Sequence, residues 1–223
     1  MGLYGIARKT FVSDDFHFAQ FEFQLDSYRE YLKITNLTIE KNLKTYVEKY
    51  KELGEYVDYY FDSAESFVKV ECLQLYYSSI IISLYSFLEQ SMLRLCMISE
   101  GSQTIKISDI AGKGIFQFKT YLEKVVKIDF KPINDEWNEI RKYNHLRNLF
   151  VHASNSVLDK SESKKRINSI REIKDLRISE KDNYFIIDFQ NDYVITNFIK
   201  TINKFLIKLY YVDFEKFPET YCS

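Results

Sequence analysis

A long helical stretch from about Glu65 to Ile98 constrains the fold of this chain more than any other feature, because its middle is apolar on nearly every side. Its aliphatic and aromatic residues are Leu73, Leu75, Ile80, Ile81, Ile82, Leu84, Phe87 and Leu88. A helix with apolar residues on every face has to be covered by neighbouring helices or by a partner chain. The stretch therefore predicts a central helix with other elements packed around it.

Residues that interrupt helices are scarce in the rest of the chain. Two prolines and six glycines occur in 223 residues, and both residue types destabilise helix interiors. Apolar residues recur every three or four positions, which predicts N-terminal helices over residues 14–60 with a break at Thr35-Asn36. Further helices are expected over residues 116–126 and from Asn134 onward.

The region before the C-terminal end is expected to depart from this helical pattern. Leu176-Arg177-Ile178 and the run from Tyr184 to Phe189 have the composition of strands, and the polar residues between them predict a β-hairpin. The hairpin and a final amphipathic helix, capped by Asn191-Asp192, together cover residues 176–213. The mixed-charge residues after Asn155 predict a loop that leads into a short helix.

These patterns predict an all-α fold class, namely an up-and-down helical bundle with long central helices, in a single domain of residues 1–223. The formal net charge of −1 argues against a protein that coats nucleic acid, but it allows a local nucleic-acid site. Three cysteines without a pairing pattern fit a reducing compartment. Serines and tyrosines interrupt the apolar run Leu75–Leu88, so we expect no membrane span and a cytoplasmic protein.

Polar residues form a stripe on the later helix that begins at Asn134. If the segment is helical, Asn144, Asn148 and His152 lie on one face at spacings of four residues, with Arg147 beside Asn148. A metal site is not expected, because His145 and His152 are seven residues apart and have no cysteine or acidic residue beside them. No cofactor is expected either.

A cation, an amide and an imidazole within one and a half helical turns suit phosphodiester chemistry. Histidine can move a proton near neutral pH, and arginine can hold phosphate oxygens and stabilise the negative charge of the transition state. No metal is required if the 2′-hydroxyl of RNA is the nucleophile. One helix carries one copy of this set, so a two-fold dimer that places two stripes face to face would build a fuller site.

The stretch from Arg147 to His152 (RNLFVH) resembles the R-x4-6-H motif of HEPN domains, in the form with asparagine directly after the arginine. The wider context is also similar, since a long apolar helix with a late glutamate (Leu84–Glu89) precedes the motif. The resemblance covers residues 67–155. The helices of residues 14–60 and the hairpin with the C-terminal helix would be elaborations of this HEPN-like core.

The resemblance implies a metal-independent endoribonuclease that acts as a homodimer, with the motifs of both subunits at the interface. Many such proteins are toxins of toxin–antitoxin systems or effectors of antiphage defence. By this resemblance Arg147, Asn148 and His152 are the catalytic residues, and Glu89 on the preceding helix supports them. Asn144, one turn before Asn148, is a second supporting residue.

The sequence also allows several alternatives. Members neutralised by a nucleotidyltransferase antitoxin often carry tyrosine at the position of Ser154. Control by tyrosine modification is therefore not expected, and any antitoxin or defence-system partner would act in another way. The chain could instead be a non-catalytic helical module that dimerises or binds a partner, or a regulatory subunit of a defence complex. In that case His152 would pack near a helix end, Arg147 would pair with an acid, and Glu89 would pair with Arg94.

Overall fold

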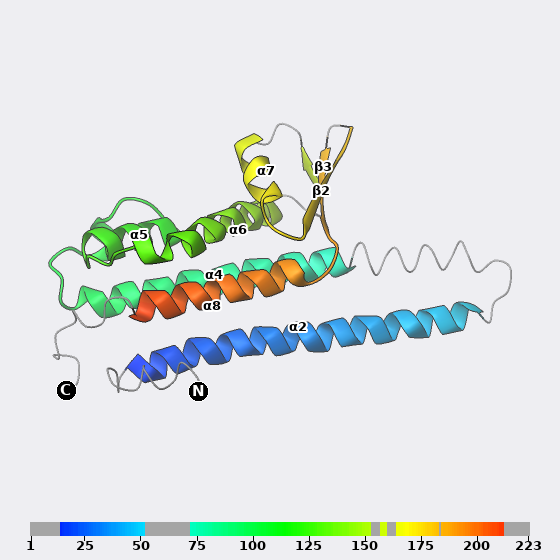
Figure 1. Cartoon of the computed structure of the whole chain (residues 1–223), viewed down its shortest axis with the longest axis horizontal. Helices are drawn as coiled ribbons and strands as arrows, with labels where there is room; N and C mark the ends of the chain where they lie inside the picture. Colours follow the sequence, from blue (N-terminus) through cyan, green and yellow to red (C-terminus); the bar gives the residue numbers. More distant parts are fainter. Residues whose placement is uncertain (1–13, 52–71, 153–156, 160–163, 183, 212–223) are drawn as a thin grey trace. The chain divides into compact units, whose positions relative to one another are not determined.

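The chain is mostly helical in a computed structural model that describes residues 14–51, 72–152, 157–159, 164–182 and 184–211. Its described α-helices are α2 (Asp14–Lys51), α4 (Leu73–Glu100), α5 (Gly114–Lys124), α6 (Asn134–His152), α7 (Lys164–Arg171) and α8 (Tyr193–Tyr211) (Figure 1). Two short 3₁₀ turns, η3 (Ile107–Asp109) and η4 (Lys131–Ile133), flank α5, and the strands are β1 (Val157–Asp159), β2 (Leu176–Lys181) and β3 (Tyr184–Phe189). The helical fold class and the hairpin before the C-terminal helix are therefore confirmed.

The N-terminal helix α2 is continuous, so the expected break at Thr35-Asn36 is wrong. The side chain of Asn36 does not cap a helix. It donates a hydrogen bond from Nδ2 to Asp192 Oδ2 at 2.8 Å and accepts one from the Tyr77 hydroxyl at 3.3 Å. These tertiary bonds outweigh the weak helix propensity of asparagine. The expected continuation over residues 52–60 lies outside the described residues.

Helix α4 forms the later part of the long apolar stretch, and the expected start near Glu65 lies outside the described residues. Of the helices that the structure describes, α4 is long and apolar enough to cross a membrane, judged by length and composition alone. More than half of its most apolar window, 56%, is buried inside the protein, as is common for the central helix of a helical core.

The chain divides into two compact units. Unit 1 comprises Met1–Asp26, Ser86–Ile140 and Lys200–Ser223, and unit 2 comprises Ser27–Tyr85 and Arg141–Ile199. Each of α2, α4, α6 and α8 contributes a segment to both units. Segments distant in the sequence therefore build each unit, and the residues of the polar stripe on α6 belong to unit 2.

Aromatic rings form the centre of unit 1. Trp137 of α6 is 5% exposed, and the centroid of its ring lies 5.7 Å from that of Phe116, in an edge-to-face arrangement, and 6.0 Å from that of Phe205. Such aromatic pairs add stability beyond the burial of their surface. At the margin, Lys208 of α8 forms an ion pair with Glu136 at 2.8 Å. This packing fixes the first turns of α6 against α8.

In unit 2 the later part of α6 packs on the first turns of α8. The rings of Tyr143 and Phe198 are stacked with a centroid distance of 4.0 Å and an interplanar angle of 10°. The buried Tyr143 hydroxyl donates a hydrogen bond to the carbonyl oxygen of Val194 at 2.9 Å. At the start of α8, the backbone amide of Tyr193 donates to Asn191 Oδ1 at 2.9 Å, which confirms the expected cap.

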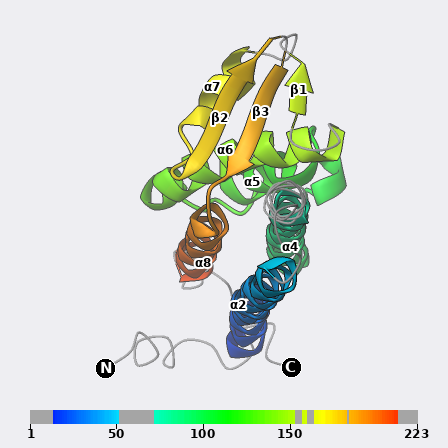
Figure 2. The same cartoon turned by 90° about the vertical axis from the view of Figure 1, so that its right-hand side faces the viewer.

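A three-stranded antiparallel sheet completes unit 2, with strand order β1-β3-β2. Strands β2 and β3 form the expected hairpin, in which Lys181 is opposite Tyr184 and Leu176 is opposite Phe189. Strand β1 was not expected, because three residues are too short to give an alternating pattern. The short helix expected in this region is present as α7. Figure 2 shows the three strands side by side, with α7 behind them.

Candidate functional site

The polar stripe belongs to the part of α6 that lies in unit 2. Asp135 and Glu136 occupy the first turn of the helix, where acidic residues favour the positive end of its dipole. Further along, Tyr143, Leu146 and Leu149 are buried in the core of the unit. The intervening residues Asn144, Arg147 and Asn148 are half-buried, as expected for a polar face at the edge of a core.

A chain of hydrogen bonds joins three of the candidate residues. Arg147 donates from Nη1 to Asn148 Oδ1 at 2.9 Å, and Asn148 donates from Nδ2 to Asn144 Oδ1 at 3.4 Å. The carboxamide of Asn148 thus uses its acceptor for the guanidinium and its donor for Asn144. The structure therefore brings Asn144, Arg147 and Asn148 together, with Asn144 as the residue that accepts the hydrogen bond of the Asn148 amide.

An aromatic ring from another helix holds the same guanidinium. Arg147 Cζ lies 5.4 Å from the ring centroid of Tyr85 on α4, within the range of a cation–π interaction. Tyr85 is only 4% exposed, so its ring is fixed in the core of unit 2. The sequence did not single out Tyr85, because nothing distinguishes it from the other 17 tyrosines before α4 and α6 are brought together.

Most of the hydrogen-bond donors of Arg147 have no partner among the residues that the structure describes. It forms no ion pair with any residue that the structure describes, so the expected alternative of an acid paired with Arg147 finds no partner there. Its Nε atom is buried and has no hydrogen-bond partner in the part of the chain that the structure describes. A guanidinium has five N–H donors, and the bond to Asn148 uses one of them. A half-buried cation without a carboxylate partner is well suited to bind an anion, because a phosphate supplies both the charge and the acceptors it lacks.

His152 is the last residue of α6, and its side chain lies outside the described part of the structure. Its backbone continues the helix from Asn148, so the two residues are one turn apart on the same face, at a spacing of four. The helical spacing expected for the stripe is therefore present over Asn144, Asn148 and His152.

Glu89 belongs to unit 1 and packs against the start of α5. A Cβ atom at Gly114 would collide with the carboxylate of Glu89, and Gly114 has a φ of +57°. The expected alternative in which Glu89 pairs with Arg94 is wrong, since no such ion pair is present between these two described residues. Instead Arg94 donates a hydrogen bond from Nη1 to Gln20 Oε1 on α2.

The described residues give little support to a metal site or to a cysteine nucleophile. Within them, no group of three or more histidine, cysteine, aspartate or glutamate side chains is arranged to hold a metal ion. Burial is the main cause that raises the pKa of the Cys96 thiol to about 12, and Glu100 adds to it. A thiol with that pKa is protonated at neutral pH, so Cys96 is a poor nucleophile.

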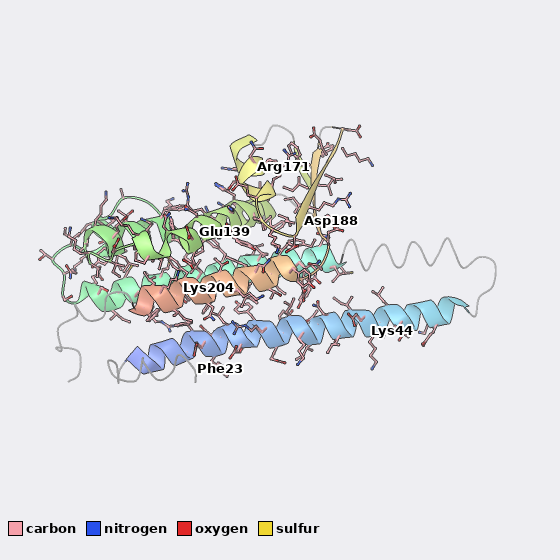
Figure 3. All side chains as sticks on the ribbon, viewed as in Figure 1. Phe23, Lys44, Glu139, Arg171, Asp188 and Lys204 are labelled. Carbon is pink, nitrogen blue, oxygen red and sulfur yellow. The ribbon has the colours of Figure 1, made fainter. Side chains whose placement is uncertain are left out.

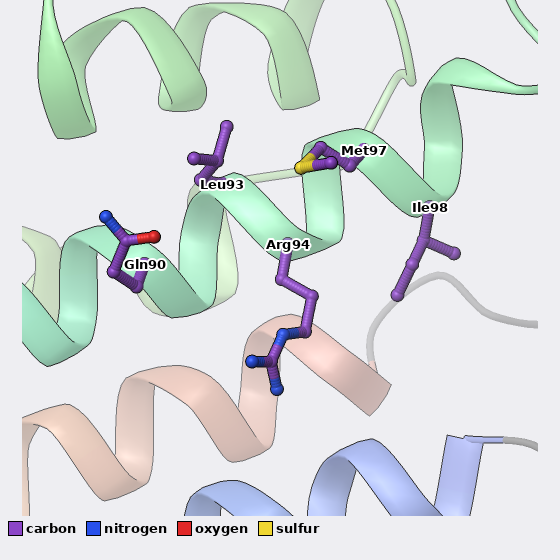
Figure 4. Close-up of a pocket in the computed structure, with 5 residues that line it drawn as sticks. All are labelled: Gln90, Leu93, Arg94, Met97 and Ile98. Atoms are coloured by element: carbon purple, nitrogen blue, oxygen red, sulfur yellow. The ribbon is translucent and has the colours of Figure 1, made fainter.

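A shallow pocket lies on α4 in unit 1, and its residues precede the polar stripe of α6 in the chain. Gln90, Leu93, Arg94, Met97 and Ile98 line it, all from one side of the helix (Figure 4). Met97 is 61% exposed, which is high for a methionine on a central helix. Arg94 is the one ionisable residue of this lining, and Leu93, Met97 and Ile98 make most of it apolar.

Comparison with known proteins adds no assignment to this geometry. No protein-family model, curated protein or solved structure matches the chain.

Proposed function

We propose that this chain is a metal-independent endoribonuclease whose substrate phosphate binds at Arg147. The observation that carries this proposal is the guanidinium itself, which is held by Tyr85 and Asn148, yet its buried Nε has no hydrogen-bond partner among the described residues. Fixed cations of this kind stabilise negative charge that develops on a phosphoryl group without having to reorganise during the reaction. The resemblance to HEPN domains points to the same residue.

In the proposed reaction the ribose 2′-oxygen attacks the adjacent phosphorus. The 2′-O–P bond forms, the P–O5′ bond breaks, and the products are a 2′,3′-cyclic phosphate and a 5′-hydroxyl. The proton of the 2′-hydroxyl has to leave, and the 5′-oxygen has to gain one. An imidazole suits one of these transfers, which is the role proposed for His152. Arg147 would hold the non-bridging oxygens, and Asn148 would keep the guanidinium in position.

A homodimer is part of this proposal. One chain carries a single set of Arg147, Asn148 and His152 on one helix, and a two-fold axis beside that helix would bring two sets together. Such a composite site would form only after association, so its activity would depend on protein concentration. By the same resemblance, the cellular role would be that of a toxin or an antiphage effector restrained by an antitoxin or another defence-system partner.

Incubation of the purified chain with total RNA in the presence of a chelator is expected to yield fragments with 2′,3′-cyclic phosphate and 5′-hydroxyl ends. These ends follow from attack by the 2′-hydroxyl, which needs no metal-bound water. Gel separation of tRNA and mRNA would identify the RNA class, and enzymatic end-labelling would identify the termini. Cleavage that requires added metal, or products with 5′-phosphate ends, would contradict the mechanism.

Substitution of Tyr85 by leucine is expected to lower kcat/KM for RNA cleavage by roughly 2- to 30-fold, the range of a cation–π interaction. The change removes the aromatic ring over Arg147 and keeps an apolar side chain in the core. Tyr85→Phe is the matched control, since it retains the ring, and it should stay close to the wild type. Equal activity of the leucine and phenylalanine variants would show that the ring does not position the guanidinium.

A non-catalytic interaction module is the second candidate, and the pocket on α4 favours it. Leu93 and Met97 present apolar surface on this helix, and Met97 is largely exposed. A helix face of this kind can bind an apolar segment of a partner. A chain that binds a partner through this face, but never cleaves RNA under any condition of the assay above, would favour this reading.

A further inference from the structure

Helix α2 carries two aliphatic side chains that its own unit leaves exposed. From Ser27 onward α2 belongs to unit 2. Leu32 is buried in the core, whereas Ile34 and Leu37 are 60% and 57% exposed. Single exposed apolar residues are common on proteins, but these two are three positions apart and are therefore neighbours on one face of the helix. Together they form an exposed aliphatic pair on the side of α2 that is turned away from its core.

Charged residues continue this face in both directions along α2. Glu30 lies four residues before Ile34, and Lys41 lies four residues after Leu37, so the successive spacings are four, three and four. This is the spacing of the contact positions of a coiled coil. Both charged side chains are exposed, as is Lys44 three residues further on (labelled in Figure 3). We call Glu30, Ile34, Leu37 and Lys41 the outer face of α2.

The outer face is complementary to itself when two copies of α2 run antiparallel. A two-fold axis midway between Ile34 and Leu37 would place Ile34 beside Leu37 of the partner subunit, and the symmetry repeats this contact. The same axis would place Glu30 beside Lys41 of the partner subunit, again twice. Apolar side chains then meet apolar side chains at the centre, and a carboxylate meets an ammonium group on each side of it.

The residues beside the outer face match in the same arrangement. Positions that flank the contact stripe of a coiled coil form ion pairs between helices, and here Lys33 would meet Glu40 of the partner subunit. Both side chains are exposed, and within one chain Lys33 Nζ lies 3.6 Å from Glu30 Oε2. The contact would extend this pair into a network of alternating charge, in the order Glu40 of the partner subunit, Lys33, Glu30 and Lys41 of the partner subunit. Ion pairs in a network contribute more than isolated surface pairs.

The same residues oppose the other ways of pairing two α2 helices. In a parallel pair, Glu30 would face Glu30 of the partner subunit, and Lys41 would face Lys41 of the partner subunit. An antiparallel pair shifted by one heptad would place Ile34 against Glu30 of the partner subunit, or Leu37 against Lys41 of the partner subunit. Repulsion between like charges and the desolvation of a charge by an aliphatic side chain both cost stability. The outer face therefore favours one register.

We propose that a second copy of this chain packs on the outer face of α2. The two helices are antiparallel, with Ile34 and Leu37 at the centre and ion pairs between Glu30 and Lys41 on both sides. The occupant is a second copy because the charges of the face complement those of the same face in reverse order. Negative design by charge of this kind selects one partner and one orientation.

This interface is separate from the dimer proposed for the polar stripe, and it does not rest on the proposed function. Helix α2 carries no residue of the stripe. It contacts α4 through the hydrogen bond between the hydroxyls of Tyr28 and Ser83 at 2.6 Å, whereas α4 contacts α6 through Tyr85 and Arg147. Chains that associate through both α2 and α6 would form assemblies of at least four copies.

Sedimentation of the full chain without RNA, over a wide range of protein concentration, measures the assembly. Ile34→Glu/Leu37→Glu is expected to halve its mass, to monomers if only α2 associates and to dimers if α6 associates as well. The matched control Met97→Glu/Ile105→Glu adds the same charge at two exposed apolar residues of unit 1 and should keep the wild-type mass. All four side chains are exposed, so circular dichroism should match the wild type in both variants.

Charge reversal tests the register. Glu30→Lys and Lys41→Glu are each expected to weaken association roughly tenfold or more, because two ion pairs per dimer are lost and two repulsive contacts of similar size replace them. An equimolar mixture of the two variants is expected to regain the wild-type mass. In the mixed dimer the new lysine of one chain meets the new glutamate of the other, and the native Lys41 of the first meets the native Glu30 of the second.

Three results would overturn the inference. The first is a wild-type chain that stays monomeric at every concentration. The second is an Ile34→Glu/Leu37→Glu variant with the wild-type mass, which would leave association to another surface such as α6. The third is a mixture of the charge-reversal variants that stays as dissociated as each variant alone. None of these measurements involves cleavage, so they leave the proposed ribonuclease activity to its own assay.

Discussion

Substitution of Arg147 by alanine is expected to lower kcat for RNA cleavage by about 10²- to 10³-fold, the usual loss when one fixed group that stabilises transition-state charge is removed. The guanidinium would have no replacement, since the alanine variant leaves Asn148 and Tyr85 without the cation that they position. Single-turnover cleavage at saturating RNA is the measurement, because it reports the chemical step and not binding.

Arg141→Ala supplies the matched control for Arg147. Arg141 lies on the same helix, is exposed and belongs to the same unit, so its removal changes the net charge by the same amount. It should cleave at the wild-type rate. Arg147→Lys is informative as well, because it keeps the charge and loses the planar fork that binds two phosphate oxygens. Full activity of Arg147→Ala would remove this residue from the mechanism.

His152→Ala is expected to reduce kcat by about 10²- to 10⁴-fold, the contribution of a general acid or base. The pH dependence of kcat should change at the same time, since the variant lacks the titrating imidazole. A loss of fold or association would reduce activity without that change. Comparison of the pH–rate profiles, with circular dichroism and sedimentation as checks on fold and dimer, separates the two causes.

Mixtures of the two inactive variants test whether the site is shared between subunits. A dimer that combines Arg147→Ala and His152→Ala chains still holds one intact arginine and one intact histidine in a composite site. Mixed samples are therefore expected to regain part of the activity that each variant lacks alone. Mixtures as inactive as the separate variants, despite proven exchange of subunits, would place the whole site within one chain.

The fold could be predicted largely where local chemistry decides it. The cap at Asn191 and the apolar face of α8 depend on neighbouring residues, and both are present as expected. The sequence predicts a break at Thr35-Asn36, whereas α2 is continuous there and the side chain of Asn36 bonds Asp192, 156 residues away. Strand β1 likewise exists only because β3 pairs with it. Contacts between distant segments are what a single sequence could not provide.

The candidate site likewise has features that local sequence predicts and features that depend on contacts between distant segments. Helical periodicity alone placed Asn144 and Asn148 one turn apart, and the hydrogen bond between them follows from that spacing. The ring of Tyr85 lies over Arg147 because α4 and α6 pack together, and no local sequence pattern predicts this contact. The packing of Glu89 against Gly114 depends on the fold too, because a backbone turn at the start of α5 makes room for the carboxylate.

Because Cys96 is buried, the reactivity of its thiol can report local opening of the protein around it. The side chain is 0% exposed, and its thiol donates a hydrogen bond to the carbonyl oxygen of Phe118 on α5. A thiol-specific reagent can reach this sulfur only in molecules where α4 and α5 have separated for a moment. Once Cys72 and Cys222 are replaced by serine, the labelling rate of the remaining thiol, divided by that of an unfolded peptide, becomes an equilibrium constant for that separation. The free energy of a local opening in unit 1 could thus be followed residue-specifically while RNA or a partner is added.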